Sequence, residues 1–220
     1  MKLFFGLLLI ALINLSGCQN PITKAVRNVE YSAYEMVGIQ KRDLLKTRIE
    51  NARDEQKEVG KKFTDALQQL KNVYGFKGGQ LEKQYDSLKK AYDRAHDQGE
   101  NVHSSIRKVE FVAGDLFKEW NKEIDQIEMR TLKQKSREQL INTQKKYSDL
   151  HGNLIASEAK IDPALKKLND NVLYLKHNLN AKAIVSLKSE IGDIQGEIEN
   201  LIREMNKSIE SAEKFTQEML

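Results

Sequence analysis

The sequence predicts an all-α protein, an elongated antiparallel helical bundle or coiled coil of three or four long helices. Three observations support this fold class. Charged residues make up 31% of the chain and only two residues are proline, a composition typical of long helices. Apolar residues recur in alternating steps of three and four, the period of a helix that packs lengthwise on another. Three glycines within 75–79 indicate a turn between two such segments.

The first helix is expected over 24–74. Its apolar seam runs from Ile22 to Met36 and again from Leu45 to Val73, and the phase is lost near Gly38. A glycine kink and a run of four-residue steps both explain this break, and the sequence leaves the two open. In the second part of the seam, every position is apolar except Gln56.

The second helix is expected over 81–128, with an unbroken seam from Leu81 to Trp120. A sustained period of 3.5 residues predicts a left-handed supercoil. Two helices of similar length on either side of the glycine turn at 75–79 predict an antiparallel hairpin.

The second half of the chain has weaker boundaries. The seam is lost over 128–136, where we expect a second bend, and apolar residues then return every seven positions from Leu140 to Leu175. Asp162 is expected to cap a new helix with Pro163 as its first residue, which predicts a restart or a kink. A last helix carries the stripe from Ile184 to Met219. The sequence leaves open whether Gly38, 128–136 and Asp162-Pro163 are kinks or full turns.

Polar residues interrupt the seam between Leu175 and Ile184. His177, Asn178 and Asn180 lie there, and a polar layer inside a bundle fixes the register of its helices. We therefore expect a polar core layer from these residues, with a ligand site and simple exposure as the alternatives.

The first seventeen residues have the pattern of a signal peptide. Lys2 gives a positive start, an apolar run follows from Leu3 to Ile13, and small residues precede Cys18. The run is too short for a transmembrane helix, which needs about 20 apolar residues. Ordinary cleavage with Cys18 as a bystander is the other alternative. Cys18 is the only cysteine, so the rest of the chain has no thiol, as suits an oxidising compartment.

The four residues Leu15-Ser16-Gly17-Cys18 resemble the lipobox of bacterial lipoproteins. This resemblance implies removal of residues 1–17, attachment of diacylglycerol and a further acyl chain such as palmitate at Cys18, and a short lipidated tether over 18–23. Residues 24–220 then form a single elongated domain. By the same resemblance, Gln19 in place of aspartate implies the outer membrane, facing the periplasm, rather than the inner membrane.

Composition and motifs argue against several functions. A net charge of +4 is too balanced to indicate nucleic-acid binding. The glycines of 75–79 lack the Gly-Lys-Ser/Thr of a phosphate loop, and we expect no catalytic residue, cofactor or metal. His96, Glu100 and His103 share one helical face, a spacing that metal ligands can have, but a solvated flank of the seam is the preferred interpretation. No enzyme is predicted.

A basic stretch follows the second bend and forms a possible contact surface. It contains Arg130, Lys133, Lys135 and Arg137, with Lys145 and Lys146 further on. Such a surface suits anionic lipid headgroups or an acidic cell-wall polymer, and a solvated helix face is the simpler alternative.

Two stretches, Val37–Asp43 and Leu173–Ile184, together with Phe117–Trp120, resemble an uncharacterised family of predicted lipoproteins from Gram-negative bacteria. The family is known only as a domain of unknown function. The resemblance runs from about Tyr31 to Phe215 and implies a long helical fold and export, without an activity.

Together these observations predict a lipid-anchored periplasmic coiled-coil protein. We expect a structural scaffold or adaptor, held to the membrane at Cys18, that binds a protein partner the sequence does not identify. A holdase-like chaperone for outer-membrane proteins is the alternative. The sequence leaves open whether the seams close within one chain or between copies, and therefore whether the protein is a homo-oligomer.

Overall fold

The computed structural model describes residues 40–75, 80–180, 182, 184–185 and 191–218. The predicted signal peptide, Cys18, the seam before Gly38 and most of the glycine cluster lie outside the described residues, and the predictions made for them stay predictions. Residues 41–220 form one compact unit, separate from residues 1–40.

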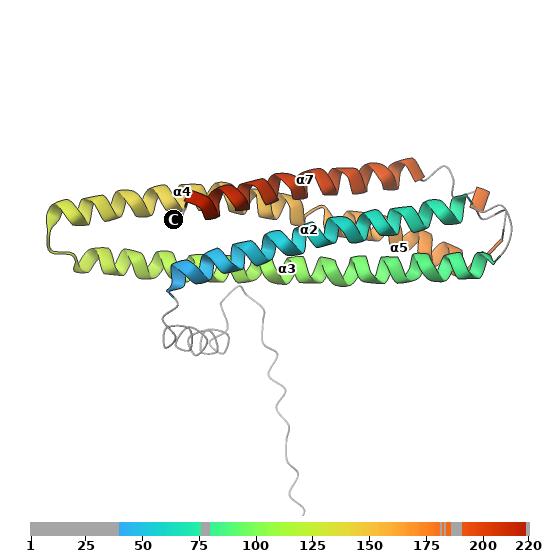
Figure 1. The fold of residues 1–220 in the computed structure, drawn as a ribbon, viewed down its shortest axis with the longest axis horizontal. Helices are drawn as coiled ribbons and strands as arrows, with labels where there is room; N and C mark the ends of the chain where they lie inside the picture. Colours follow the sequence, from blue (N-terminus) through green and yellow to red (C-terminus); the bar gives the residue numbers. More distant parts are fainter. Residues whose placement is uncertain (1–39, 76–79, 181, 183, 186–190, 219–220) are drawn as a thin grey trace, which may run out of the picture. The chain divides into compact units, whose positions relative to one another are not determined.

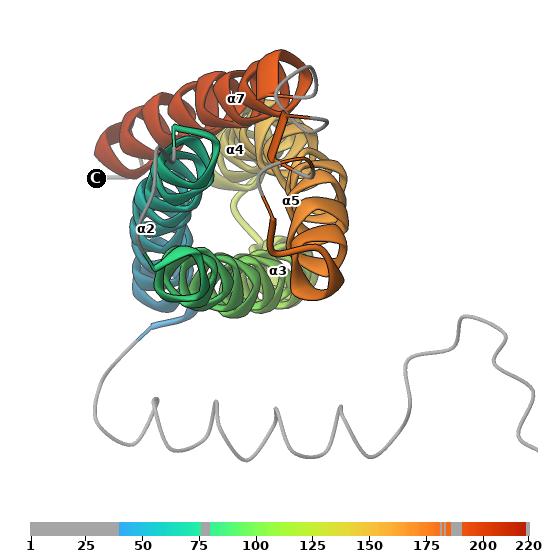
Figure 2. The same ribbon diagram turned by 90° about the vertical axis from the view of Figure 1, so that its right-hand side faces the viewer.

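The all-α fold is confirmed for the described residues. The helices are α2 (Lys41–Tyr74), α3 (Leu81–Gln126), α4 (Arg130–Glu158), α5 (Ile161–His177) and α7 (Ile191–Glu218). Successive arms run in opposite directions (Figure 1). Helices α4 and α5 follow one another in a single arm, so that four columns surround a common centre (Figure 2). Helix α2 borders α3 and α7, and the α4–α5 arm borders the same two helices. The α4–α5 arm is thus diagonally opposite α2.

The heptad seams form the core of this bundle. In α2 every predicted seam position from Leu45 to Val73 is completely buried, Gln56 included. The seam of α3 is buried from Leu88 to Ala113 except at Tyr92, which is partly exposed, and that of α7 is buried from Ile194 to Phe215. Burying one such Leu, Ile or Phe side chain contributes about 1.5–3 kcal/mol. The described seams therefore close on one another within a single chain.

The α3–α4 hairpin extends past its neighbours at one end of the bundle (Figure 1). Helix α3 has 46 residues and α2 has 34. Lys41 at the start of α2 pairs with Glu119 of α3, with Nζ and Oε2 2.9 Å apart. The last turns of α3 and the first turns of α4 therefore lie beyond the start of α2. We call residues 120–140 the hairpin end.

The second bend is a full turn, and it is shorter than predicted. Helix α3 ends at Gln126 and α4 begins at Arg130, with extended backbone at Ile127 and Met129. Residues 130–136, which were expected to belong to the bend, are helical. The seam is lost over these residues because the hairpin end has no α2 or α7 beside it, not because the helix stops.

The chain also restarts near Pro163, but not with the predicted caps. Helix α4 ends at Glu158, and α5 begins at Ile161 with Lys160 as its N-cap. Asp162 and Pro163 are thus the second and third residues of α5. The proline ring clashes with the carbonyl group four residues earlier in a continuous helix, which is that of Ala159. This clash explains a kink at Ala159–Lys160 without a reversal of the chain.

Gly99 marks the closest approach between α3 and α5. A Cβ atom there would lie 2.9 Å from Cγ2 of Ile161, a stiff and completely buried side chain. We expect Gly99→Ala to destabilise the bundle, because overpacking costs about 1–3 kcal/mol and exceeds the gain in helix propensity. Gly152→Ala is the matched control, since nothing lies within 4 Å of its Cβ position, and it should stabilise the helix by about 1 kcal/mol. Urea unfolding of both variants measures the two signs, and equal effects would contradict the close packing.

Candidate functional site

The hairpin end carries the predicted basic surface. Arg130, Lys135 and Arg137 are exposed in the first turns of α4, and Lys133 is partly exposed. Lys133 Nζ donates a hydrogen bond to the Asp125 carbonyl oxygen at 3.0 Å, and Arg137 Nη2 lies 3.2 Å from the Asp125 carboxylate. Two of the four cations therefore hold the turn closed. Arg130 and Lys135 form no ion pair with the described residues and remain available to another molecule.

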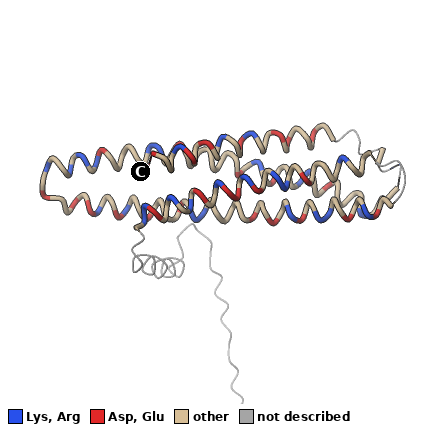
Figure 3. The backbone as a smooth tube through the Cα atoms, in the orientation of Figure 1, with Lys and Arg blue, Asp and Glu red and all other residues tan. Residues whose placement is uncertain are grey.

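Apolar side chains are exposed at the same end. Met129 is 61% exposed in the turn, and Leu132 is 51% exposed in the first turn of α4. Figure 3 shows the basic residues of early α4 next to this turn. The turn therefore combines exposed apolar side chains with unpaired cations, a combination that heptad analysis of the sequence did not find.

A cleft opens where the hairpin end meets the four-helix part. Its volume is ≈ 520 Å³, and it is bordered by the start of α2 and the end of α7. Leu116, Trp120 and Phe215 are its apolar lining residues, and Glu123, Asn142 and Thr143 are among its polar ones. At its rim, Lys146 Nζ lies 2.8 Å from the Glu218 carboxylate. Both signs of charge line the cleft, so it does not select a strongly charged ligand.

An aromatic cluster lies beside the cleft and joins three helices. The ring of Tyr147 in α4 packs edge-on against Phe117 of α3 and Phe215 of α7 and stacks on His151. Burial, helped by the negative charge of Glu110, raises the pKa of Tyr147 well above its usual range. The phenol therefore stays neutral at physiological pH and serves as a packing residue.

Histidines link α3 to the α4–α5 arm. His103 Nδ1 lies 2.6 Å from a Glu158 oxygen and its Nε2 lies 3.5 Å from Asp162. His151 Nε2 lies 2.7 Å from Glu110. His103 therefore spans the α4–α5 kink, which corrects the expectation of a solvated flank, while His96 and Glu100 are exposed.

The two nitrogens of the His103 ring face different carboxylates, those of Glu158 and Asp162. The imidazole and the two carboxylates therefore do not converge on one point where a metal ion could bind. Across the described part of the chain, no group of three or more His, Cys, Asp or Glu residues is arranged to hold a metal ion.

The predicted polar core layer is not formed by His177, Asn178 and Asn180. His177 and Asn180 are exposed, and Asn178 is partly exposed as the C-cap of α5. Asn178 Nδ2 donates to the Tyr174 carbonyl oxygen on the same helix. These residues end a helix, and the phase changes there because the helix stops.

Buried polar contacts lie deeper in the bundle instead. Gln56 Nε2 donates to Ser157 Oγ at 2.7 Å, and both residues are completely buried. Tyr74 Oη donates to Asn171 Oδ1. Both contacts join α2 to the diagonally opposite α4–α5 arm. These two contacts fix the register of α2 relative to the α4–α5 arm across the centre of the bundle.

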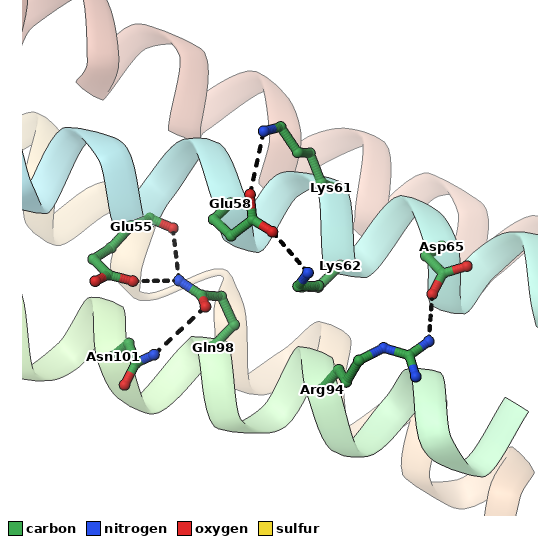
Figure 4. Close-up of polar contacts among 8 residues, drawn as sticks. All are labelled: Glu55, Glu58, Lys61, Lys62, Asp65, Arg94, Gln98 and Asn101. Carbon is green, nitrogen blue, oxygen red and sulfur yellow. Dashed lines mark hydrogen bonds and ion pairs between the residues drawn. The ribbon is translucent and has the colours of Figure 1, made fainter. Parts of the chain in front are cut away.

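Charged contacts at the edge of the α2–α3 interface are more exposed (Figure 4). Arg94 Nη2 lies 2.7 Å from the Asp65 carboxylate, and this hydrogen bond holds the pKa of Asp65 below its usual value. Within α2, hydrogen bonds from Lys62 and Lys61 lower the pKa of Glu58 in the same way. A half-exposed pair between helices such as Asp65–Arg94 contributes about 0–1 kcal/mol, so it tunes the interface rather than holding it.

Among the described residues, no helix combines the length and the hydropathy needed to cross a membrane. Several ion pairs join neighbouring helices, such as Lys41–Glu119 and Arg94–Asp65. Exposed large apolar residues include Met129 and Leu132 at the hairpin end and Leu173 and Val185 elsewhere.

A comparison with protein families matches residues 30–219 to a family described as "Protein of unknown function (DUF2959)". The chain belongs to this family. The DUF2959 match covers all the described helices, so the bundle is the family domain. A search of curated proteins finds no match to the chain. The resemblance predicted from Val37–Asp43 and Leu173–Ile184 to a family of unknown function is confirmed, and the family brings no activity with it.

Proposed function

We propose that this protein is a lipid-anchored rod that acts as a structural scaffold or adaptor in the periplasm, held to the outer membrane through Cys18. One observation carries the proposal. The apolar seams of all four columns are buried against one another in a single chain. Such a bundle needs no second copy to complete its core, and its outer surfaces stay available to partners.

The geometry suits a spacer. Helix α3 alone, with 46 residues, is about 69 Å long at 1.5 Å per residue. The α4–α5 arm keeps its seam buried on both sides of the kink, from Leu154 to Leu168. The rod therefore keeps a defined distance between whatever binds its two ends.

The anchor completes this proposal. A single acyl chain gives only marginal attachment, whereas two or more give a stable one. A cysteine with diacylglycerol and an acylated amine would hold the rod firmly, and the residues from Gln19 to Gln40 would connect it to α2. The lipobox at Leu15–Cys18 supports this step.

A holdase-like chaperone would use the same anchor differently. Holdases shield unfolded chains with exposed apolar surface. In the described bundle the apolar seams are buried against one another and are not exposed in this way. The bundle would have to open to offer them, which would expose its core to water. The scaffold is therefore the function that the geometry supports better.

Crosslinking in living cells tests the proposal. A photoreactive residue at Leu173, which is 50% exposed near the end of α5, and another at Ile155, which is 38% exposed in α4, would each report a neighbour. The same residue at the buried Phe63 is the control. We expect one or two specific proteins from the exposed positions and none from Phe63. A broad spectrum of unfolded outer-membrane proteins would contradict the scaffold and favour the holdase.

A further inference from the structure

The hairpin end differs from a typical helix turn in what it exposes. A turn between two helices is normally polar, yet Met129 and Leu132 are among the largest exposed apolar residues of the described chain. Arg130 lies between them in sequence, and Lys135 follows one turn later. Apolar groups next to cations are the chemistry of a segment that rests in the headgroup region of a membrane.

The position of this turn agrees with a membrane contact. Helix α2 begins at the same end of the bundle, because Lys41 pairs with Glu119. Helix α3 continues for seven residues after Glu119, to Gln126, a distance of about 10 Å at the helical rise, and the turn with Met129 follows directly. Residues 19–40 join Cys18 to the start of α2 and, at no more than about 3.5 Å per residue, span at most about 77 Å. A lipid on Cys18 would therefore be attached through the end of the bundle that carries the turn.

We propose that the hairpin end docks on the surface of an anionic phospholipid bilayer. Met129 and Leu132 enter the interface between headgroups and acyl chains, and Arg130 and Lys135 lie against the phosphates. The lipid anchor of the proposed function explains why a bilayer is near, but the contact itself depends only on the bundle. A second attachment point of this kind fixes the tilt of the rod on its membrane.

The charges of the hairpin end set the expected salt dependence. Asp125 is engaged by Arg137 and Lys133, whereas the carboxylates of Glu123, Glu128 and Glu138 are exposed. These three acids oppose part of the attraction from Arg130, Lys135 and the exposed Lys122. The apolar side chains therefore carry most of the binding, and we expect salt to weaken it without abolishing it.

Vesicle sedimentation tests the contact without the anchor. All described core residues lie between Leu44 and Phe215, so the chain from Gln19 to Leu220 keeps the whole bundle and has no lipid. It is mixed with vesicles of phosphatidylcholine alone or with one third phosphatidylglycerol. We expect binding to the anionic vesicles, and a loss of at least tenfold in affinity for M129S/L132S on them. R130Q/K135Q should lose less, about fivefold in all, because the neighbouring acids oppose part of the attraction of about 1 kcal/mol per charge, and only on the anionic vesicles.

A matched variant at the other end of the rod controls for a general effect of the substitutions. L173S/K176Q removes one half-exposed leucine and one exposed lysine of α5, and it should bind as the unchanged chain does. The proposal is overturned if neither vesicle binds, or if the control variant loses as much as the hairpin variants. It is also overturned if the hairpin variants bind vesicles normally but lose a crosslinked protein in cells, because the surface then recognises a protein. A failed vesicle assay leaves the scaffold proposal standing, because crosslinking tests that separately.

Discussion

Replacing Cys18 with serine should release the entire protein from the membrane fraction. Cys18 is the only thiol in the chain, and within the described residues no helix is suited to cross a bilayer. Without the thiol no diacylglycerol can attach, and the remaining hairpin contact is too weak to hold the protein during washing. Labelling cells with a radioactive or clickable fatty acid, followed by fractionation, measures both effects.

Mutation of the neighbouring Gln19 provides the control for this experiment. Gln19→Asp leaves the thiol in place, so labelling should persist while the protein moves from the outer to the inner membrane. If the Cys18→Ser protein still carries label and sediments with membranes, the lipoprotein interpretation is wrong. If Gln19→Asp leaves the distribution unchanged, only the choice of membrane is wrong.

Ser157→Ala should destabilise the bundle by about 1–3 kcal/mol, the usual cost of a buried polar group without a partner. Its hydroxyl accepts the hydrogen bond of Gln56 Nε2 at 2.7 Å, and Gln56 Oε1 has no partner within the described structure. Removing Ser157 therefore leaves the whole buried amide unsatisfied. For a chain of this size, such a loss lowers the melting temperature by about 2–4 °C for each kcal/mol.

The double variant Q56L/S157A separates the hydrogen bond from the packing. With both polar groups gone, stability should return to that of the unchanged chain or exceed it, while the fixed register of the diagonal helices loosens. Ser208→Ala is the matched control, because Ser208 Oγ is buried without a partner among the described residues. It should be neutral or stabilising. Equal losses for Ser157→Ala and Ser208→Ala would show that the Gln56 contact does not matter.

The heptad rule predicted the fold well because the core of this bundle is built almost wholly from seam positions. The periodicity from Leu45 to Val73 fixes which face of α2 is buried, and all of those residues are buried. The same rule held for the arm from Leu140 to Leu175. Ser157 lies three residues after the seam position Leu154, and Asn171 lies three residues after Leu168. These intermediate heptad positions are the signal by which the buried polar contacts could have been found.

Other features required three dimensions. The polar layer expected at His177, Asn178 and Asn180 was wrong because a loss of heptad phase has two causes, a polar layer and the end of a helix. The sequence led us to expect His103 in solvent. Its carboxylate partners, Glu158 and Asp162, lie on the α4–α5 arm, too far away in sequence for the heptad pattern to indicate them. A periodicity within one helix gives no information about which residues of another helix lie opposite.

The candidate site was predicted in part. The basic residues Arg130 to Arg137 stood out as a run of like charge, but their division into turn-closing and unpaired cations follows from Asp125. The exposure of Met129 and Leu132 follows from the different lengths of α2 and α3. Only the packed bundle shows that two of its columns stop before the hairpin end.

Complementation of a deletion strain by the untethered rod is the sharpest test of the scaffold. We expect an exported chain from Gln19 to Leu220, abundant and folded in the periplasm, to leave the phenotype of the deletion unchanged. The chain with Cys18 intact, produced at the same level, should restore it fully. A scaffold must be held at the membrane to set the distance between membrane and partner, so full complementation by the untethered rod would contradict the proposed function.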